Sequence, residues 1–209
     1  MRTRRDSHAA RLIRPAAFLT LAASLLQGCS SGTPVPADNM QPPPGHGPYT
    51  GTVADWPLWF PWHSFGAYCF GVQSCTIDYA GHRHQIERPA RSLESLEHPL
   101  DKVLHAGIGL IPNFPPAARL SWVAADGTEL ESTVDMARMF ANRMILHPVA
   151  REDILEDTSI PPPGIIVVID DRTVSVYMST WIALKESRDP SNPHSNLHTG
   201  ITLVSSQMH

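Results

Sequence analysis

The chain has 209 residues, of which 42% are hydrophobic, and it carries 16 basic and 20 acidic side chains for a formal net charge of −4. This length suits a single domain with one hydrophobic core. The negative charge argues against nucleic acid, and against an anionic lipid surface, as a partner held by charge.

The N-terminal segment has the layout of a secretory signal. Five arginines fall within residues 1–14, and residues 16–26 are apolar except for Thr20 and Ser24. Such a run is too short to span a bilayer as a helix, but it matches the hydrophobic region of a signal peptide. The sequence therefore predicts export.

The apolar run ends in Leu26-Gln27-Gly28-Cys29, which resembles the lipobox of bacterial lipoproteins. In that family the Cys thiol is diacylated, the signal is removed before it, and the new N-terminus is acylated. The resemblance implies Cys29 as the lipidation site and residues 1–28 as the signal peptide. The alternative is an ordinary signal peptide with an incidental Cys. Ser30 stands where the family carries Asp for inner-membrane retention, so we expect delivery to the outer membrane.

The predicted mature chain is more acidic than the full chain. Without residues 1–28, eleven basic and nineteen acidic side chains remain, which gives a net charge of −8. Membrane attachment must then come from the acyl chains, in which each buried methylene contributes about 0.8 kcal/mol. Residues 29–55 are rich in Pro and Gly and predict a tether, and residues 56–209 predict a single β-rich binding domain.

The domain is expected to begin with an aromatic segment. Residues 56–62 contain three Trp and one Phe. We expect them to cover one edge of the core, with prolines that block a sheet edge. The alternative is an exposed binding strip.

Cys69 and Cys75 remain as an even pair for an oxidising compartment once Cys29 is lipidated. The residues around them predict two short strands with a turn at residues 71–74. We therefore expect a hairpin closed by a disulfide, which contributes roughly 2 kcal/mol for so short a loop. Because the chain has no Cys-x-x-Cys pattern, we expect no metal or cofactor at these thiols.

His82 and His84 share one face of a predicted strand. No His-Glu-x-x-His pattern accompanies them, and few acidic residues lie nearby. We expect solvated or packed histidines here rather than metal ligands.

The elements that follow are mostly strands. Residues 103–111 predict a buried strand, and residues 118–134 predict a hairpin that turns at Asp126-Gly127. Asp135 is expected to cap a helix of about ten residues, because apolar side chains recur at helical spacing after it.

The C-terminal part predicts a second hairpin. Residues 165–169 are almost all β-branched, residues 170–172 predict the turn, and residues 173–178 alternate. Residues 181–185 are expected to extend that strand, and residues 201–204 to add an edge strand. The predicted fold class is α+β: a mainly antiparallel β sheet or sandwich with one principal helix.

Negative charge is concentrated between Asp126 and Asp157, where eight acids stand against three arginines. Acids at a hairpin tip and in a loop are expected to be exposed. We interpret six of them as part of a surface that binds a basic partner: Asp126, Glu129, Glu152, Asp153, Glu156 and Asp157. The alternative is a solvated acidic face.

The chain contains no Gly-x-Ser-x-Gly elbow, no phosphate loop and no dinucleotide fingerprint. Their joint absence from the sequence favours a binding protein over an enzyme.

Three stretches carry a further resemblance: Asn113-Phe-Pro-Pro-Ala-Ala-Arg-Leu-Ser-Trp-Val-Ala-Ala-Asp-Gly127, Leu146-His-Pro-Val-Ala-Arg-Glu-Asp153 and Pro163-Gly-Ile-Ile-Val-Val-Ile-Asp-Asp-Arg-Thr-Val-Ser-Val-Tyr-Met178. They resemble small envelope lipoproteins encoded beside type VI secretion phospholipase effectors, which act as their immunity proteins. The resemblance covers about residues 57–185 and the lipobox.

This resemblance implies a non-catalytic inhibitor in the periplasm, which binds a lipase effector before the lipase reaches phospholipid. It implies no catalytic residue. The alternative is a structural or assembly lipoprotein of the envelope, which would share the anchor, the tether and the β domain.

Overall fold

The computed structural model of the chain describes residues 41–192 and 195–209. These residues belong to one compact unit. The predicted signal peptide, the lipidation site Cys29 and residues 29–40 of the tether lie outside the described residues.

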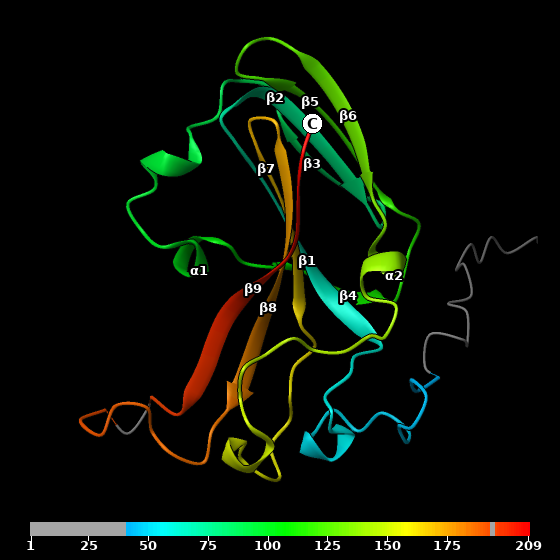
Figure 1. Ribbon diagram of the computed structural model, residues 1–209, viewed down its shortest axis with the longest axis vertical. Coiled ribbons are helices and arrows are strands. Elements are labelled where there is room, and N and C mark those ends of the chain that lie inside the picture. Colours follow the sequence, from blue (N-terminus) through cyan, green and yellow to red (C-terminus); the bar gives the residue numbers. More distant parts are fainter. Residues whose placement is uncertain (1–40, 193–194) are drawn as a thin grey trace, which may run out of the picture. The chain divides into compact units, whose positions relative to one another are not determined.

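Nine strands of the described chain form two sheets (Figure 1). The five-stranded sheet has the order β4-β1-β7-β8-β9, with β1 (Trp62–Phe70), β4 (Ile108–Pro112), β7 (Gly164–Asp170), β8 (Thr173–Ala183) and β9 (Leu197–Met208). The four-stranded sheet has the order β3-β2-β5-β6, with β2 (Val72–Tyr79), β3 (His82–Ile86), β5 (Ala118–Ala124) and β6 (Glu129–Val134). All strand pairs are antiparallel except β1 with β7.

The helical pieces are short: η2 (Val53–Asp55), η3 (Leu93–Ser95), α1 (Leu100–Val103), α2 (Met136–Met139) and η4 (Arg151–Asp153). The predicted α+β class with mainly antiparallel sheets is therefore confirmed.

The main core lies between the two sheets. It joins alternate residues of β7 and β8 to side chains of the four-stranded sheet, among them Ile165, Val167, Val176, Ile77, Leu120 and Trp122. The other face of β7 is buried as well, because Ile166 and Val168 pack with Phe70 and Leu104 in a second cluster. This two-sided burial explains the run of β-branched residues in β7.

Residues 91–107 cover part of the outer face of the five-stranded sheet. Leu93, Leu96 and Leu100 pack on the second cluster. The Tyr68 hydroxyl accepts the amide N–H of His105 at 2.8 Å and donates to its carbonyl oxygen at 3.1 Å. The buried strand predicted for residues 103–111 is thus only partly correct, since the strand is β4 at one sheet edge and its Leu110 is 67% exposed.

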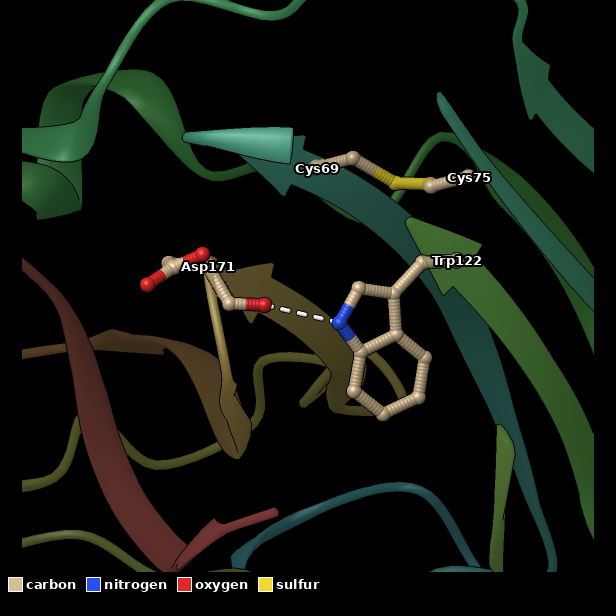
Figure 2. Close-up of a disulfide and its surroundings, with 4 residues drawn as sticks. All are labelled: Cys69, Cys75, Trp122 and Asp171. Carbon is tan, nitrogen blue, oxygen red and sulfur yellow. Dashed lines mark hydrogen bonds between the residues drawn. A yellow bond between two sulfur atoms is a disulfide. The ribbon is translucent and has the colours of Figure 1, made fainter. Parts of the chain in front are cut away.

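The predicted hairpin at the cysteines is wrong, because β1 and β2 belong to different sheets. Only Gly71 separates them, and its φ of +60° is a left-handed conformation that glycine adopts without strain. The disulfide between Cys69 and Cys75 therefore joins the two sheets (Figure 2). Strand propensity alone does not distinguish a hairpin turn within one sheet from a connection between strands of two different sheets.

The helix after Asp135 is shorter than predicted. Asp135 does cap it, because its carboxylate accepts the amide N–H of Arg138 at 3.1 Å. However, α2 ends at Met139, and Arg143 turns the chain with φ +54°. The amide of Ile145 then donates to the carbonyl oxygen of Leu58 at 2.8 Å. Pairing with an N-terminal segment thus replaces further helical turns.

The aromatic segment packs on the core, as expected, except for Trp56, which is 38% exposed. Leu58, Trp59 and Phe60 are each at most 2% exposed. Tyr49 packs edge-on against Trp59, with ring centroids 5.2 Å apart, and Asp55 accepts the amide N–H of Gly51 at 2.7 Å. Residues 49–55 therefore belong to the domain, so the predicted boundary at residue 56 is a few residues too late.

Both predicted hairpins are present. The first turns at Asp126-Gly127, where Gly127 has φ +87°, and it joins β5 to β6. The second turns at Asp171-Arg172 and joins β7 to β8. β8 continues to Ala183, two residues short of the extension predicted for residues 181–185. β9 forms the sheet edge and contains the edge strand predicted for residues 201–204.

Candidate protein-binding surface

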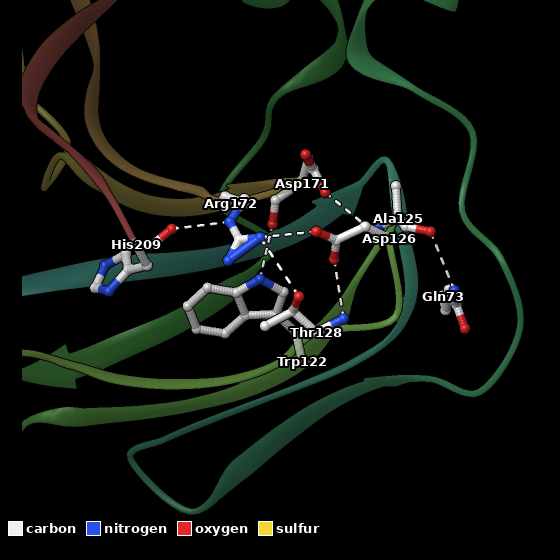
Figure 3. A network of polar contacts seen from close by, with 8 residues as sticks. All are labelled: Gln73, Trp122, Ala125, Asp126, Thr128, Asp171, Arg172 and His209. Carbon is white, nitrogen blue, oxygen red and sulfur yellow. Dashed lines mark hydrogen bonds and ion pairs between the residues drawn. The ribbon is translucent and has the colours of Figure 1, made fainter.

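Asp126, at the tip of the first hairpin, takes part in a network that joins the two sheets (Figure 3). Its carboxylate accepts from the guanidinium of Arg172 at 2.8 Å and from the amide of Thr128 at 2.9 Å. Hydrogen bonds from Thr128 and from Arg172 lower the pKa of Asp126 to about 2. Arg172 also donates to the carbonyl oxygen of His209 at 3.1 Å. A partner that binds the Asp126 carboxylate, as predicted, would compete with these internal contacts.

The acidic loop (residues 151–157) holds four of the other predicted residues. Glu156 accepts from Arg151 at 2.6 Å and lies 3.5 Å from the Lys185 ammonium. The hydrogen bond from Arg151 is the main cause that lowers the pKa of Glu156. Glu152, Asp153 and Asp157 are exposed, and none makes an ion pair within the described ranges.

The structure places the two acidic groups at opposite ends of β8. Asp126 contacts Arg172, which directly precedes β8, whereas Ile154 pairs with Leu184, which directly follows it. The strand between them has 11 residues, and at about 3.3 Å per residue it separates the groups by roughly 35 Å. The six acids therefore do not form one continuous surface.

The outer face of β8 and β9 carries a different feature, which the sequence reasoning missed. Along β8, Val174, Val176, Met178, Thr180 and Ile182 point into the core, so the residues between them point outward. Trp181 is one of these outward residues and is 55% exposed. The alternation already recognised for residues 173–178 would have placed Trp181 outside had it been continued.

Cross-strand pairing gathers further apolar side chains beside Trp181. Leu197 of β9 is opposite Ala183, and Leu203 is opposite Tyr177. Of the eight large apolar side chains that are exposed among the described residues, three lie together at the C-terminal end of β8: Leu155, Trp181 and Leu197. Leu203 and Met208 lie farther along the same face, because their partners Tyr177 and Thr173 are four and eight residues from Trp181. An exposed apolar patch of this kind marks an interaction surface more often than single exposed side chains do.

A groove adjoins Trp181 on the side of α1. It has a volume of about 460 Å³, and its lining includes Lys102, His105, Pro162, Ser179, Trp181 and Ile201. Gly164 also lines the groove. A larger residue would not fit at this position, because a Cβ there would approach the Ser179 hydroxyl and Ala106 Cβ too closely. The groove is thus a shallow, largely apolar recess between the segment that covers the sheet and the outer ends of β8 and β9.

Ser64, Asp101 and His105 line the same groove, and these are the residue types of a hydrolase triad. No hydrogen bond joins them in the described part of the chain. His105 Nε2 instead pairs with the carbonyl oxygen of Lys102 at 3.2 Å, and the Asp101 carboxylate lies 3.7 Å from the Lys102 ammonium. The nucleophile–base contact that such a triad needs is not formed.

The outer face of the four-stranded sheet is polar by comparison. Asp78 pairs with Arg83 at 2.7 Å, and along β6 the outward positions are Glu129 and Glu131. The predicted partner-binding residue Glu129 therefore lies on this polar sheet face, away from the apolar one.

The histidines of the described ranges form no metal site. Among residues 41–192 and 195–209, no group of three or more His, Cys, Asp or Glu side chains is placed to hold a metal ion. His63 is fully buried, with Nδ1 2.6 Å from Asn113 Oδ1 and Nε2 3.1 Å from the Tyr79 hydroxyl. Burial lowers the pKa of His63 to about 4. This histidine is therefore neutral at physiological pH and forms part of the core.

Comparisons with known protein families, with curated proteins and with solved structures found no match to this chain. No helix within the described residues is long and apolar enough to cross a membrane.

Proposed function

We propose that this protein is a lipid-anchored immunity protein, which binds and inhibits a type VI secretion phospholipase effector in the periplasm. The observation that carries the proposal is the apolar outer face at the C-terminal end of β8, where Leu155, Trp181 and Leu197 are exposed together. Buried aromatic anchors dominate the binding energy of protein–protein interfaces, so a face of this composition supports a protein partner.

The lipobox and the tether support the location. A chain anchored through Cys29 would hold the domain near the envelope lipids that a phospholipase attacks. The net charge of −8 for the mature chain offers no other attachment to an anionic membrane surface. The resemblance of residues 113–127, 146–153 and 163–178 to immunity lipoproteins supports the class of the partner.

The experiment uses the gene next to this one. We expect the mature lipoprotein to co-purify with a lipase-like effector encoded there and to suppress the phospholipase activity of that effector on vesicles. An unrelated secreted phospholipase serves as the control and should remain active. A neighbouring lipase that stays fully active and does not bind would overturn the proposal and would favour a structural or assembly accessory of the envelope.

A further inference from the structure

We infer that the partner docks where the apolar outer face meets the acidic loop, and that the docking surface of the partner is basic around an apolar recess. The inference rests on the proposed function and specifies its interface. We call the apolar part the Trp181 patch: Leu155, Trp181, Ala183 and Leu197.

Backbone pairing brings the Trp181 patch together from three segments. Ala183 is opposite Leu197 on one side. On the other side the amide of Leu155 donates to the carbonyl oxygen of Ala183 at 2.9 Å, and Ile154 pairs with Leu184. Residues directly opposite each other project from the same face of a sheet. Leu155 and Leu197 therefore flank Ala183, and Trp181 lies one outward position along the strand.

The exposure of these side chains is that of an interface anchor. Trp181 is 55% exposed, while Leu155 and Leu197 are 37% and 39% exposed. A half-buried tryptophan is held by its neighbours, so it loses little conformational freedom when a partner covers the remaining ring surface. Trp181 therefore serves as the anchor that enters a recess of the partner.

Acidic side chains border the same patch. The acidic loop contains Leu155 itself, and its Glu152 and Asp153 make no ion pair within the described ranges. Together with Glu186 they line a recess of about 420 Å³ that also contacts Lys185 and Arg188. Lys185 lies four residues beyond Trp181, roughly 13 Å along the strand. The recess and the Trp181 patch thus fit within one interface of ordinary size.

Charge decides between the possible occupants. A second copy of this chain would bring together two rims in which three acids stand against two bases, which is unfavourable. An anionic lipid surface would meet the same repulsion. A protein with lysine or arginine side chains around an apolar recess would pair with Glu152 and Asp153 and cover Trp181. The partner surface is therefore basic and partly apolar.

The test measures binding of the mature lipoprotein, in detergent, to the purified phospholipase effector encoded beside its gene. Trp181→Ala should weaken the equilibrium affinity by roughly 30-fold or more, as loss of a central aromatic anchor does. Leu110→Ala is the matched control, because Leu110 is 67% exposed on β4, at the opposite edge of the same sheet. The control should change affinity by less than about twofold.

The charge arm uses two double variants that each replace two acids by lysine. Glu152→Lys with Asp153→Lys should slow association about tenfold and reduce its dependence on salt. Glu129→Lys with Glu131→Lys changes the net charge equally but on the polar face of the other sheet. This control should slow association by less than about threefold. Thermal melting of each variant confirms that the domain stays folded.

The outcomes separate the two proposals. If the wild-type protein does not bind the lipase, the proposed function fails and the interface falls with it. If the wild type inhibits the lipase, but Trp181→Ala and the Glu152→Lys, Asp153→Lys double variant both bind like their controls, only the interface is overturned. If the wild type forms a dimer that Trp181→Ala dissolves, a second copy occupies the patch, which also overturns the inference.

Discussion

Trp122 of the four-stranded sheet donates its indole N–H to the backbone carbonyl oxygen of Asp171, in the turn of the five-stranded sheet, at 2.7 Å (Figure 2). The carboxylate of Asp171 in turn accepts the amide N–H of Ala125 at 2.9 Å. Cys75 is opposite Trp122 in the sheet and carries the disulfide to Cys69. At this end of the domain, a disulfide and two hydrogen bonds therefore link the two sheets.

Arg172 is expected to stabilise this connection between the sheets more than an isolated surface ion pair would. It bonds Asp126, Thr128 and the carbonyl oxygen of His209 (Figure 3), so Arg172→Ala should lower the melting temperature by about 2–4 °C. Arg83→Ala is the control, because Arg83 pairs with Asp78 within a single hairpin and such exposed pairs contribute little. Equal melting temperatures of the two variants would contradict the prediction.

The disulfide should stabilise the domain by restricting the step between the sheets. Replacing Cys69 and Cys75 together by Ala should lower the melting temperature by about 5 °C or more, since the link joins two elements that otherwise separate on unfolding. Differential scanning calorimetry of the variant, and of the wild type with a reductant, measures the effect. Two titratable thiols in the unfolded periplasmic protein, with Cys29 lipidated, would show that the bond is absent in the cell.

His63 should make the domain less stable in acid. Its pKa is about 4 in the folded protein and about 6.5 when unfolded, so the unfolded chain takes up the proton first as the pH falls. Stability is therefore full above about pH 6.5 and declines toward about pH 4, by up to roughly 3 kcal/mol. Urea unfolding at several pH values measures this slope.

His63→Gln separates this effect from that of the other histidines. The variant should be less stable than the wild type near neutral pH, because Asn113 Oδ1 and the Tyr79 hydroxyl lose a matched partner. It should then lose less stability than the wild type on acidification, since the substituted side chain does not titrate. Parallel pH profiles for the two proteins would exclude His63 as the source.

Cys29→Ser tests the predicted anchor. The variant should no longer fractionate with membranes, because residues 29–209 carry a net charge of −8 and no acyl chain would then hold them to a membrane. Cell fractionation and immunoblotting give the readout, with an established lipoprotein from the same cells as the control. Membrane association equal to that of the wild type would contradict the lipidation of Cys29.

Local sequence patterns predicted the strands and turns that form between residues close together in the sequence. The alternation around Trp122 and the Asp126-Gly127 turn were enough for the first hairpin, and the β-branched run was enough for the second. The pairing of β1 with β7 could not be predicted, because Ser64 and Gly164 are opposite each other across a hundred residues of sequence. The shortness of α2 has the same kind of cause. The amide of Ile145 donates to the carbonyl oxygen of Leu58, which is distant in sequence, and not to a helical partner.

The candidate interface was predicted in part. Exposure of Glu152 and Asp153 followed from their position in a loop, but their separation from Asp126 depends on the length and direction of β8. Trp181 could have been recognised by continuing the alternation of its strand. Its neighbour Leu155 could not, because only the bridge between Ile154 and Leu184 brings the two segments together.

The position of β7 also determines the order in which parts of the domain can form as the chain is synthesised. The four-stranded sheet uses only residues 72–134 and antiparallel neighbours, so it can assemble as soon as this stretch has been synthesised. β1 can already pair with β4 at this stage, but it lacks its parallel partner until β7, which begins at Gly164, has been made. Until then one side of β1 has no strand partner, and the side chains of Ile165 and Val167 are missing from the core in which Phe65 packs against Tyr79. A chain that stops before this point would expose an incomplete sheet and part of its core to chaperones and proteases.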